Sequence, residues 1–142
     1  MARFVRFLLS VLLGVVIGSA VNMGLVMLGG KVVPPPPGVD VTTTAGLKAS
    51  MHLLDIRHFM FPFLAHALGT LAGAFVACRS APDRSATPAW IVGAVSLAGG
   101  VAAVAMLPAP VWFSAVDLLL AYLPMAWLGQ RIARDGRPTR SA

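Results

Sequence analysis

Four long apolar stretches, each about the length of a membrane-crossing helix, dominate this sequence of 142 residues. A helix needs about 20 mostly apolar residues to cross the hydrocarbon core of a bilayer, because each residue adds about 1.5 Å of length. Nearly all charged residues lie between the stretches or at their ends. The sequence therefore predicts an all-α fold, an integral membrane bundle of four transmembrane helices in a single domain, with spans at about 5–29, 59–78, 89–107 and 111–129.

The composition supports a membrane protein and argues against a nucleic-acid partner. Only 11% of the residues are charged and 58% are hydrophobic, whereas soluble domains carry about 25% charged residues. The net charge of +6 could suggest nucleic-acid binding, but the basic residues flank the apolar stretches, as residues that set membrane topology do. Cys78 is the only cysteine, so no disulfide can form within the chain. We expect the lipid bilayer as partner, and neither nucleic acid nor a cofactor.

Basic residues are distributed unequally between the two ends of the stretches. Lys31, Lys48 and Arg57 fall on one side of the predicted membrane. Eight arginines fall on the other side: Arg3, Arg6, Arg79, Arg84, Arg131, Arg134, Arg137 and Arg140. Because cytoplasmic loops are enriched in Lys and Arg, both termini are expected in the cytoplasm. The tail 130–142 would then be cytoplasmic and the segment 30–58 would lie outside.

The outer segment 30–58 begins with residues that end a helix and continues with residues that favour a new helix. Four consecutive prolines at 34–37 cannot continue a helix and favour a stiff connector, although a docking motif for a proline-binding partner is the alternative. Threonines at 42–44 are candidate N-caps. After them Leu47, Met51 and Leu54 recur on one face. This pattern predicts a short extracytoplasmic amphipathic helix between the first and second spans.

Three spans each hold one strongly polar residue at a similar depth. Asn22, His66 and Asp117 lie six or seven residues from the outer ends of their spans, which corresponds to roughly 10 Å at 1.5 Å per residue. A carboxylate in hydrocarbon is costly, so we expect Asp117 to pair with His66. Asn22 and Ser114 are candidate further partners, and the Tyr122 hydroxyl nearby also needs a partner.

Small residues mark the faces on which the polar residues lie. Such residues let two helices approach closely, so the polar residues should point into the bundle, although the same faces could form a homodimer. The fourth span also contains Pro124, which removes the hydrogen bond to the Leu120 carbonyl and predicts a kink or hinge. The candidate packing glycines are Gly14, Gly18, Gly69, Gly73, Gly93 and Gly100.

Motifs for metal binding or catalysis are weak or missing. His52 and His58 lie near the outer boundary, but residues six apart do not share a helix face. We therefore expect no metal site, and these two histidines are the candidates if one exists. No nucleophile elbow, zinc-binding HExxH or phosphate-binding loop occurs in the sequence. No catalytic residue is assigned.

Three functions are compatible with this pattern. The first is transport of protons or a small polar solute through the polar core of Asn22, His66 and Asp117, a site opening outward. The second is a structural or accessory subunit that packs against a larger membrane partner, with the same residues holding helices together. The third is an intramembrane enzyme that uses His66 and Asp117 as acid and base, which the missing nucleophile disfavours.

Three stretches of the chain, NMGLVMLGGKVVPPPPGVD, HFMFPFLAHALGTLAGA and MLPAPVWFSAVDLLLAYLPMAWLG, together have a familiar pattern. They resemble a group of small four-helix bacterial membrane proteins with no assigned function. The resemblance covers 22–129. It implies a location in the bacterial inner membrane and carries over no activity and no site residue.

Overall fold

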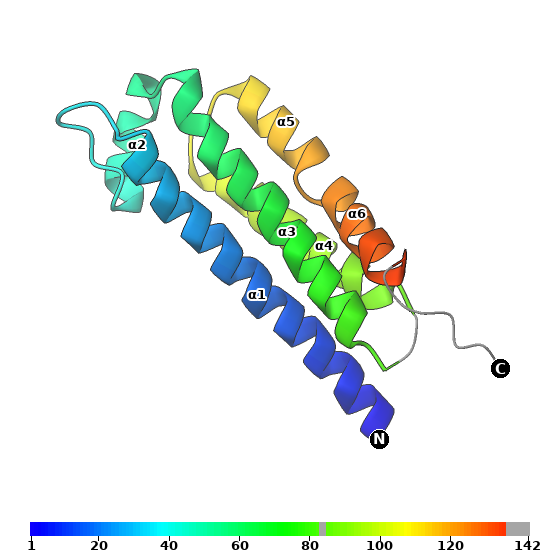
Figure 1. The fold of residues 1–142 in the computed structure, drawn as a ribbon. Helices are drawn as coiled ribbons and strands as arrows, with labels where there is room; N and C mark the ends of the chain where they lie inside the picture. The colour runs from blue at the N-terminus through cyan, green and yellow to red at the C-terminus, as the bar shows by residue number, and fades with distance from the viewer. Residues whose placement is uncertain (83–84, 136–142) are drawn as a thin grey trace.

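The computed structural model describes residues 1–82 and 85–135 as a bundle of helices (Figure 1). Four segments are long and apolar enough to cross a membrane: α1, η2 with α3, α4, and α5 with α6. This confirms the predicted all-α architecture with four apolar spans and a short helix between the first two. The elements are α1 (Ala2–Val32), α2 (Thr44–Ser50), the 3-10 turns η1 (Met51–Leu53) and η2 (Ile56–Phe59), α3 (Met60–Ser80), α4 (Thr87–Met106), α5 (Val111–Leu120) and α6 (Leu123–Asp135).

Helix α3 is the centre of the bundle. It packs on α1, on α4 and on α6, and its contact with α1 is the most extensive of the three. Figure 1 shows α3 between α1 on one side and the α5–α6 pair on the other, with α4 behind it. A residue on α3 can therefore reach three other spans, and this places His66 where it can meet partners from several helices.

The packing has large apolar side chains outside and small ones inside. Ala65, Ala74 and Ala121 are 0% exposed, while Leu12 is 58% and Leu119 is 70% exposed. A soluble domain buries its large apolar residues. The reverse arrangement suits a bundle whose surface contacts lipid and whose interior relies on close van der Waals packing of small residues. We therefore treat the four apolar segments as membrane spans.

Two glycine pairs bring α1 and α3 into backbone contact. A Cβ on Gly14 would lie 2.6 Å from the Gly73 carbonyl oxygen, and a Cβ on Gly73 would lie 2.6 Å from the Gly14 carbonyl oxygen. Gly18 and Gly69 make the same reciprocal approach at 2.8 and 2.9 Å. Any side chain at these positions would push the helices apart. These glycine faces are therefore occupied within the chain, and a homodimer would have to use another face.

The other two candidate packing glycines face the broken fourth span. A Cβ on Gly93 would lie 2.6 Å from the Cβ of Ala126, and a Cβ on Gly100 would overlap the Tyr122 ring and hydroxyl. Both glycines are on α4. They let α4 approach the region where α5 ends and α6 begins.

The fourth span, predicted for 111–129 with a kink at Pro124, consists of two helices. Helix α5 ends at Leu120 and α6 begins at Leu123. Pro124 has no N–H to donate to the Leu120 carbonyl, and a proline also disfavours helical backbone at the residue before it. The helix is therefore broken at Ala121 and Tyr122, directly before Leu123 and Pro124.

Two other boundaries differ from the prediction. Helix α1 runs from Ala2 to Val32 and is about 46 Å long at 1.5 Å per residue, longer than the predicted span. Helix α6 continues to Asp135, so the first part of the predicted tail is helical. The remainder of that tail, 136–142, lies outside the described residues. Apolar periodicity does not mark these ends, because a helix continues into polar residues until a breaker or cap stops it.

The proline connector ends α1 and then turns sharply. The Val33 N–H donates to the Gly29 carbonyl at 2.8 Å and closes the last turn of α1. The Val39 N–H then donates to the Pro36 carbonyl at 3.1 Å, and Gly38 has a φ of +82°. This is a turn with proline second and glycine third, where the positive φ requires glycine. The predicted amphipathic helix is shorter than expected, because α2 has only seven residues and two 3-10 turns follow it.

Asp40 organises the start of α2. Its Oδ1 accepts hydrogen bonds from the Thr42 N–H at 2.8 Å and the Thr42 hydroxyl at 2.7 Å, and its Oδ2 accepts one from the Thr43 hydroxyl at 2.7 Å. Thr43 is the N-cap, since its hydroxyl oxygen accepts from the Gly46 N–H at 3.0 Å. These bonds favour the carboxylate, and the largest effect, from the Thr42 hydroxyl, helps lower the pKa of Asp40 to about 2.

This network predicts an acid-sensitive cap. Because the folded pKa of Asp40 lies below its usual value of about 3.8, the stabilisation of the cap is present above that usual value and lost as the pH falls through about 2. We expect an NMR titration of the Asp40 carboxyl to give a midpoint near 2, and Thr42→Val to raise it towards 3.8. Thr44→Val is the control. A wild-type midpoint near 3.8 would contradict the hydrogen-bonded arrangement.

Candidate functional site

His66 and Asp117 meet in the interior of the bundle. The Nδ1 atom of His66, on α3, is 2.8 Å from Oδ1 of Asp117, on α5. Similar depth in two spans predicts this contact, and the central position of α3 makes it possible. The two residues are 51 positions apart in the chain, so the bond joins the second and fourth spans.

Tyr122 holds the other oxygen of the same carboxylate. Its hydroxyl donates to Oδ2 of Asp117 at 2.7 Å, and its ring stacks on the His66 ring with centroids 5.8 Å apart. Tyr122 lies at the break between α5 and α6 and is only 3% exposed. The absence of a side chain at Gly100 leaves the space for its ring. The break thus positions the hydroxyl that Asp117 needs for its second oxygen.

The geometry assigns the free nitrogen of His66. A carboxylate only accepts hydrogen bonds, so the Nδ1 atom of a neutral His66 carries the hydrogen and Nε2 keeps its lone pair. The side chain of Asp117 is 4% exposed and that of His66 is 27% exposed. Nε2 makes no hydrogen bond to any residue in the described ranges 1–82 and 85–135. A carboxylate that holds one ring nitrogen fixes the orientation of the ring and leaves the other nitrogen facing away from it.

His66 lines a cavity between α1, α3 and α4. The cavity has a volume of about 280 Å³, enough for several water molecules or a small ligand. Asp117 is not part of its wall, so the carboxylate lies behind the histidine and the imidazole faces the cavity. Polar side chains in the wall are Ser19, Asn22, His66, Thr70, Ser96 and Tyr122.

Two residues predicted as partners of Asp117 do not bond to it. Asn22 lines the cavity, and its buried Oδ1 atom has no hydrogen-bond partner among the described residues. The Ser114 hydroxyl also makes no hydrogen bond within the described part of the chain, and its backbone N–H donates to Pro110. Both Asp117 oxygens already have partners. Depth alone could not predict these outcomes, because it does not specify how α1 and α5 are rotated.

The wall of the cavity contains three hydroxyl residues that were not predicted as site residues. Thr70 follows His66 by four residues, and Ser19 precedes Asn22 by three. Such spacings place side chains on one helix face, so the helical period could have indicated both. Ser96, on α4, also lines the cavity. Ser96 lies on the face of the predicted packing glycines Gly93 and Gly100, so the helical period could have indicated it as well.

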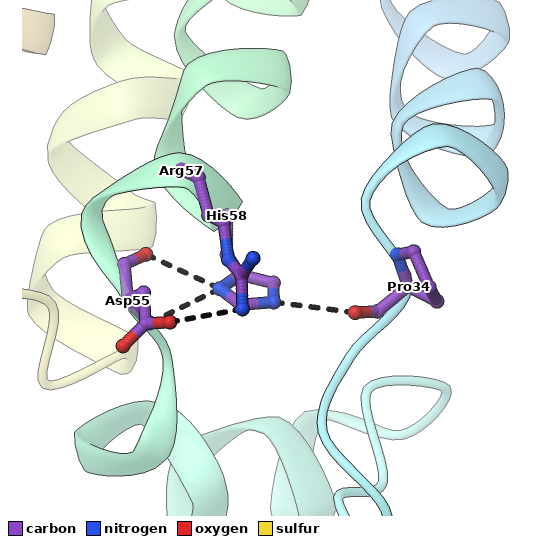
Figure 2. Close-up of polar contacts among 4 residues, drawn as sticks. All are labelled: Pro34, Asp55, Arg57 and His58. Atoms are coloured by element: carbon purple, nitrogen blue, oxygen red, sulfur yellow. Dashed lines mark hydrogen bonds and ion pairs between the residues drawn. The ribbon is translucent and has the colours of Figure 1, made fainter.

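The two histidines considered for a metal site have other roles or none. His58 Nδ1 accepts from the Asp55 N–H at 3.0 Å, and its Nε2 is 3.3 Å from the Pro34 carbonyl oxygen (Figure 2). The ring thus links the start of α3 to the proline connector, while Arg57 pairs with the Asp55 carboxylate at 3.2 Å. His52 is exposed. Within 1–82 and 85–135, no three His, Cys, Asp or Glu side chains gather where they could hold a metal ion.

Comparison of the chain with protein-family models, with curated proteins and with solved structures gives no match. The resemblance to small bacterial membrane proteins therefore stays a prediction. The functional proposal below therefore depends on the chain's own residues, chiefly on the cluster of His66, Asp117 and Tyr122 beside the cavity.

Proposed function

We propose that this protein moves protons or a small polar solute through the membrane, using the core formed by His66, Asp117 and Asn22. The observation that carries the proposal is the His66 ring, which is held at Nδ1 by a buried carboxylate and is free at Nε2 beside a cavity. Intramembrane ionisable residues are costly and commonly mark proton or solute pathways.

The chemistry follows from the order of the three groups. Nε2 accepts a proton from a molecule in the cavity, and the Asp117 carboxylate stabilises the imidazolium that forms. The Tyr122 hydroxyl keeps the carboxylate in place through its second oxygen. Protonated His66 and ionised Asp117 have no net charge together, which limits the cost of carrying the proton in a medium of low dielectric.

We also propose a location in the bacterial inner membrane with both termini in the cytoplasm. Eight arginines against three basic residues on the opposite side support this orientation. The four-span fold agrees with it, because α1 begins and α6 ends at the same end of the bundle (Figure 1). Fusion of a cytoplasm-dependent reporter to each terminus tests it, and activity of only one fusion would contradict it.

The transport proposal is tested with purified protein in liposomes that contain a pH-sensitive dye. Under an imposed pH gradient, wild-type protein should carry protons faster than protein-free liposomes. His66→Gln removes the group that accepts the proton and should reduce the rate to that of protein-free liposomes. The control is His52→Gln, which changes an exposed histidine outside the spans and should behave as wild type. Equal rates for wild type and protein-free liposomes would overturn proton movement as the function.

A structural or accessory role is the second candidate, favoured by one observation. Asp117 is 3% exposed and both of its oxygens are bonded, so it joins α3, α5 and the helix break. Hydrogen bonds of this kind between membrane helices stabilise a bundle by about 0.6–2 kcal/mol each. Under this role, changes at Asp117 would destabilise the protein without affecting any flux.

A further inference from the structure

The cavity beside His66 lies near the middle of the membrane and not at its outer surface. Its α1 residues fall between 15 and 22, its α3 residues between 66 and 70, and its α4 residues between 92 and 103. On α1 and α3 these are central parts of spans that run from 2 to 32 and from 60 to 80, whereas on α4 they reach Ala103, three residues before that helix ends at Met106. No residue of the outer connections at 33–59 and 107–110 lines the cavity. The outward opening of the site therefore stays a prediction, since the wall extends towards that end only along α4.

The cavity is closed towards the end of the bundle at which α1 begins. There the side chain of Val92 lies against Gly14 and Gly73, and its methyl groups would be 3.1 Å from a Cβ on either glycine. The same two glycines make the closest backbone approach between α1 and α3. In this conformation the contact leaves no space for a ligand to pass, so movement of a solute towards that end requires α1 and α3 to separate there.

The remaining side of the cavity is the gap between α1 and α4. Helix α1 packs mainly on α3 and touches α4 much less. On the cavity wall, Val95 is 50% exposed, and a Cβ on Gly99 would have no atom within 4 Å. Ser19, on the facing helix, is also exposed. Since α1 and α4 are both membrane spans, this gap faces the bilayer.

The polar atoms at the inner wall define what kind of group fits. Nε2 of His66 is an acceptor without a donor, and the buried Oδ1 atom of Asn22 is a second acceptor with no partner among the described residues. A hydroxyl can donate its one hydrogen to either of these acceptors, and its oxygen can accept from the amide nitrogen of Asn22. Among the residues that the structure describes, no Lys, Arg, Asp or Glu lines the cavity, so a charged head group would lack a counter-ion and be costly at this depth.

We propose that the cavity binds the hydroxyl head group of a neutral lipid-soluble amphiphile, which enters from the bilayer between α1 and α4. This inference rests on the proposed role of the cavity as a binding site, and it names the class of ligand and its route. The volume of about 280 Å³ holds a head group and the adjoining part of a chain. The rest of the chain extends into lipid through the gap.

The test uses photolabelling in phosphatidylcholine liposomes without any gradient. The probe is a long-chain primary alcohol with a diazirine near the hydroxyl, and adducts are mapped by mass spectrometry. Wild-type protein should be labelled preferentially within 15–22 and 92–103, and excess hexadecanol should compete while hexadecane does not. Labelling of the lipid-facing segment 111–120 serves as the internal reference.

Two variants test the head-group contact and the route separately. Asn22→Leu removes an amide that makes no hydrogen bond within the described protein and should lower cavity labelling about tenfold, the effect of one lost hydrogen bond to the ligand. Met23→Leu, at a lipid-facing neighbour, should not change it. Gly99→Leu places a side chain in the mouth of the cavity and should also reduce labelling. Gly24→Leu, at an equally open glycine outside the cavity, should not.

The outcomes distinguish this inference from the transport proposal. Labelling spread evenly over the spans, equal competition by hexadecane, or wild-type labelling of Asn22→Leu would each overturn the amphiphile inference. None of these measurements depends on proton flux. Proton flux without specific labelling would support the transport proposal and contradict the amphiphile inference. Specific labelling without proton flux would support the amphiphile inference and contradict the transport proposal.

Discussion

Asp117→Asn is expected to lower the proton flux of the reconstituted protein by roughly 10–100-fold, the usual effect of removing a residue that orients a functional histidine. Asparagine has nearly the same shape and can still accept a hydrogen bond from Nδ1 of His66. Its amide can also donate to the Tyr122 hydroxyl, so both contacts at 2.8 and 2.7 Å can persist. What is lost is the negative charge that stabilises the imidazolium.

The measurement combines flux in liposomes with thermal unfolding in detergent. The control is Asp55→Asn, which changes an exposed carboxylate outside the spans that pairs with Arg57 at the surface. It should keep wild-type flux. A folded Asp117→Asn protein with normal flux would refute the relay. If the Asp117→Asn variant does not fold and the wild-type protein carries no protons, the structural role of the cluster is established instead.

Gly14→Val is expected to destabilise the bundle by about 3 kcal/mol, the upper part of the usual range for a side chain forced into a packed interior. A Cβ at this position would lie 2.6 Å from the Gly73 carbonyl oxygen and 2.7 Å from the Cβ of Ala77. Backbone cannot move aside as a flexible side chain can, so α1 must separate from α3. The free energy of unfolding, measured by reversible denaturation in mixed micelles, tests this expectation.

Gly24→Val on the same helix is the matched control, because a Cβ there meets no atom within 4 Å. Its free energy of unfolding should stay within about 0.5 kcal/mol of wild type. Gly73→Val should be as harmful as Gly14→Val. Since both disturb one contact, the double variant should be less destabilised than the sum of the two. Equal effects at Gly14 and Gly24 would refute the close approach of α1 and α3.

Much of the architecture follows from local properties that the sequence displays directly. Four apolar stretches predict four spans, and the run of prolines at 34–37 predicts the end of α1. The His66 and Asp117 contact follows from depth, because two costly polar groups at one level of a small bundle stabilise each other. The threonine N-cap is also local, since Thr43 bonds within its own first turn.

Other features depend on how the helices are rotated and which of them touch. Asn22 has the predicted depth, yet it faces a cavity and not Asp117. From the sequence, the glycine faces could form either a dimer interface or a contact within one chain. The structure shows that Gly14 contacts Gly73 within one chain. Pro124 indicates a disturbance in the fourth span, but the sequence does not show that Tyr122 lies at the break with its hydroxyl bonded to Asp117.

The sequence by itself determined that this chain forms four apolar helices and that a histidine and a carboxylate lie at one depth among them. Hydropathy, proline and helical period act over a few neighbouring residues, so they can be read along the chain. Only the tertiary structure decided that His66 keeps a free nitrogen beside a cavity whose open side is the gap between α1 and α4. That outcome depends on contacts between residues far apart in sequence, and the small residues at those contacts permit more than one arrangement until the helices pack.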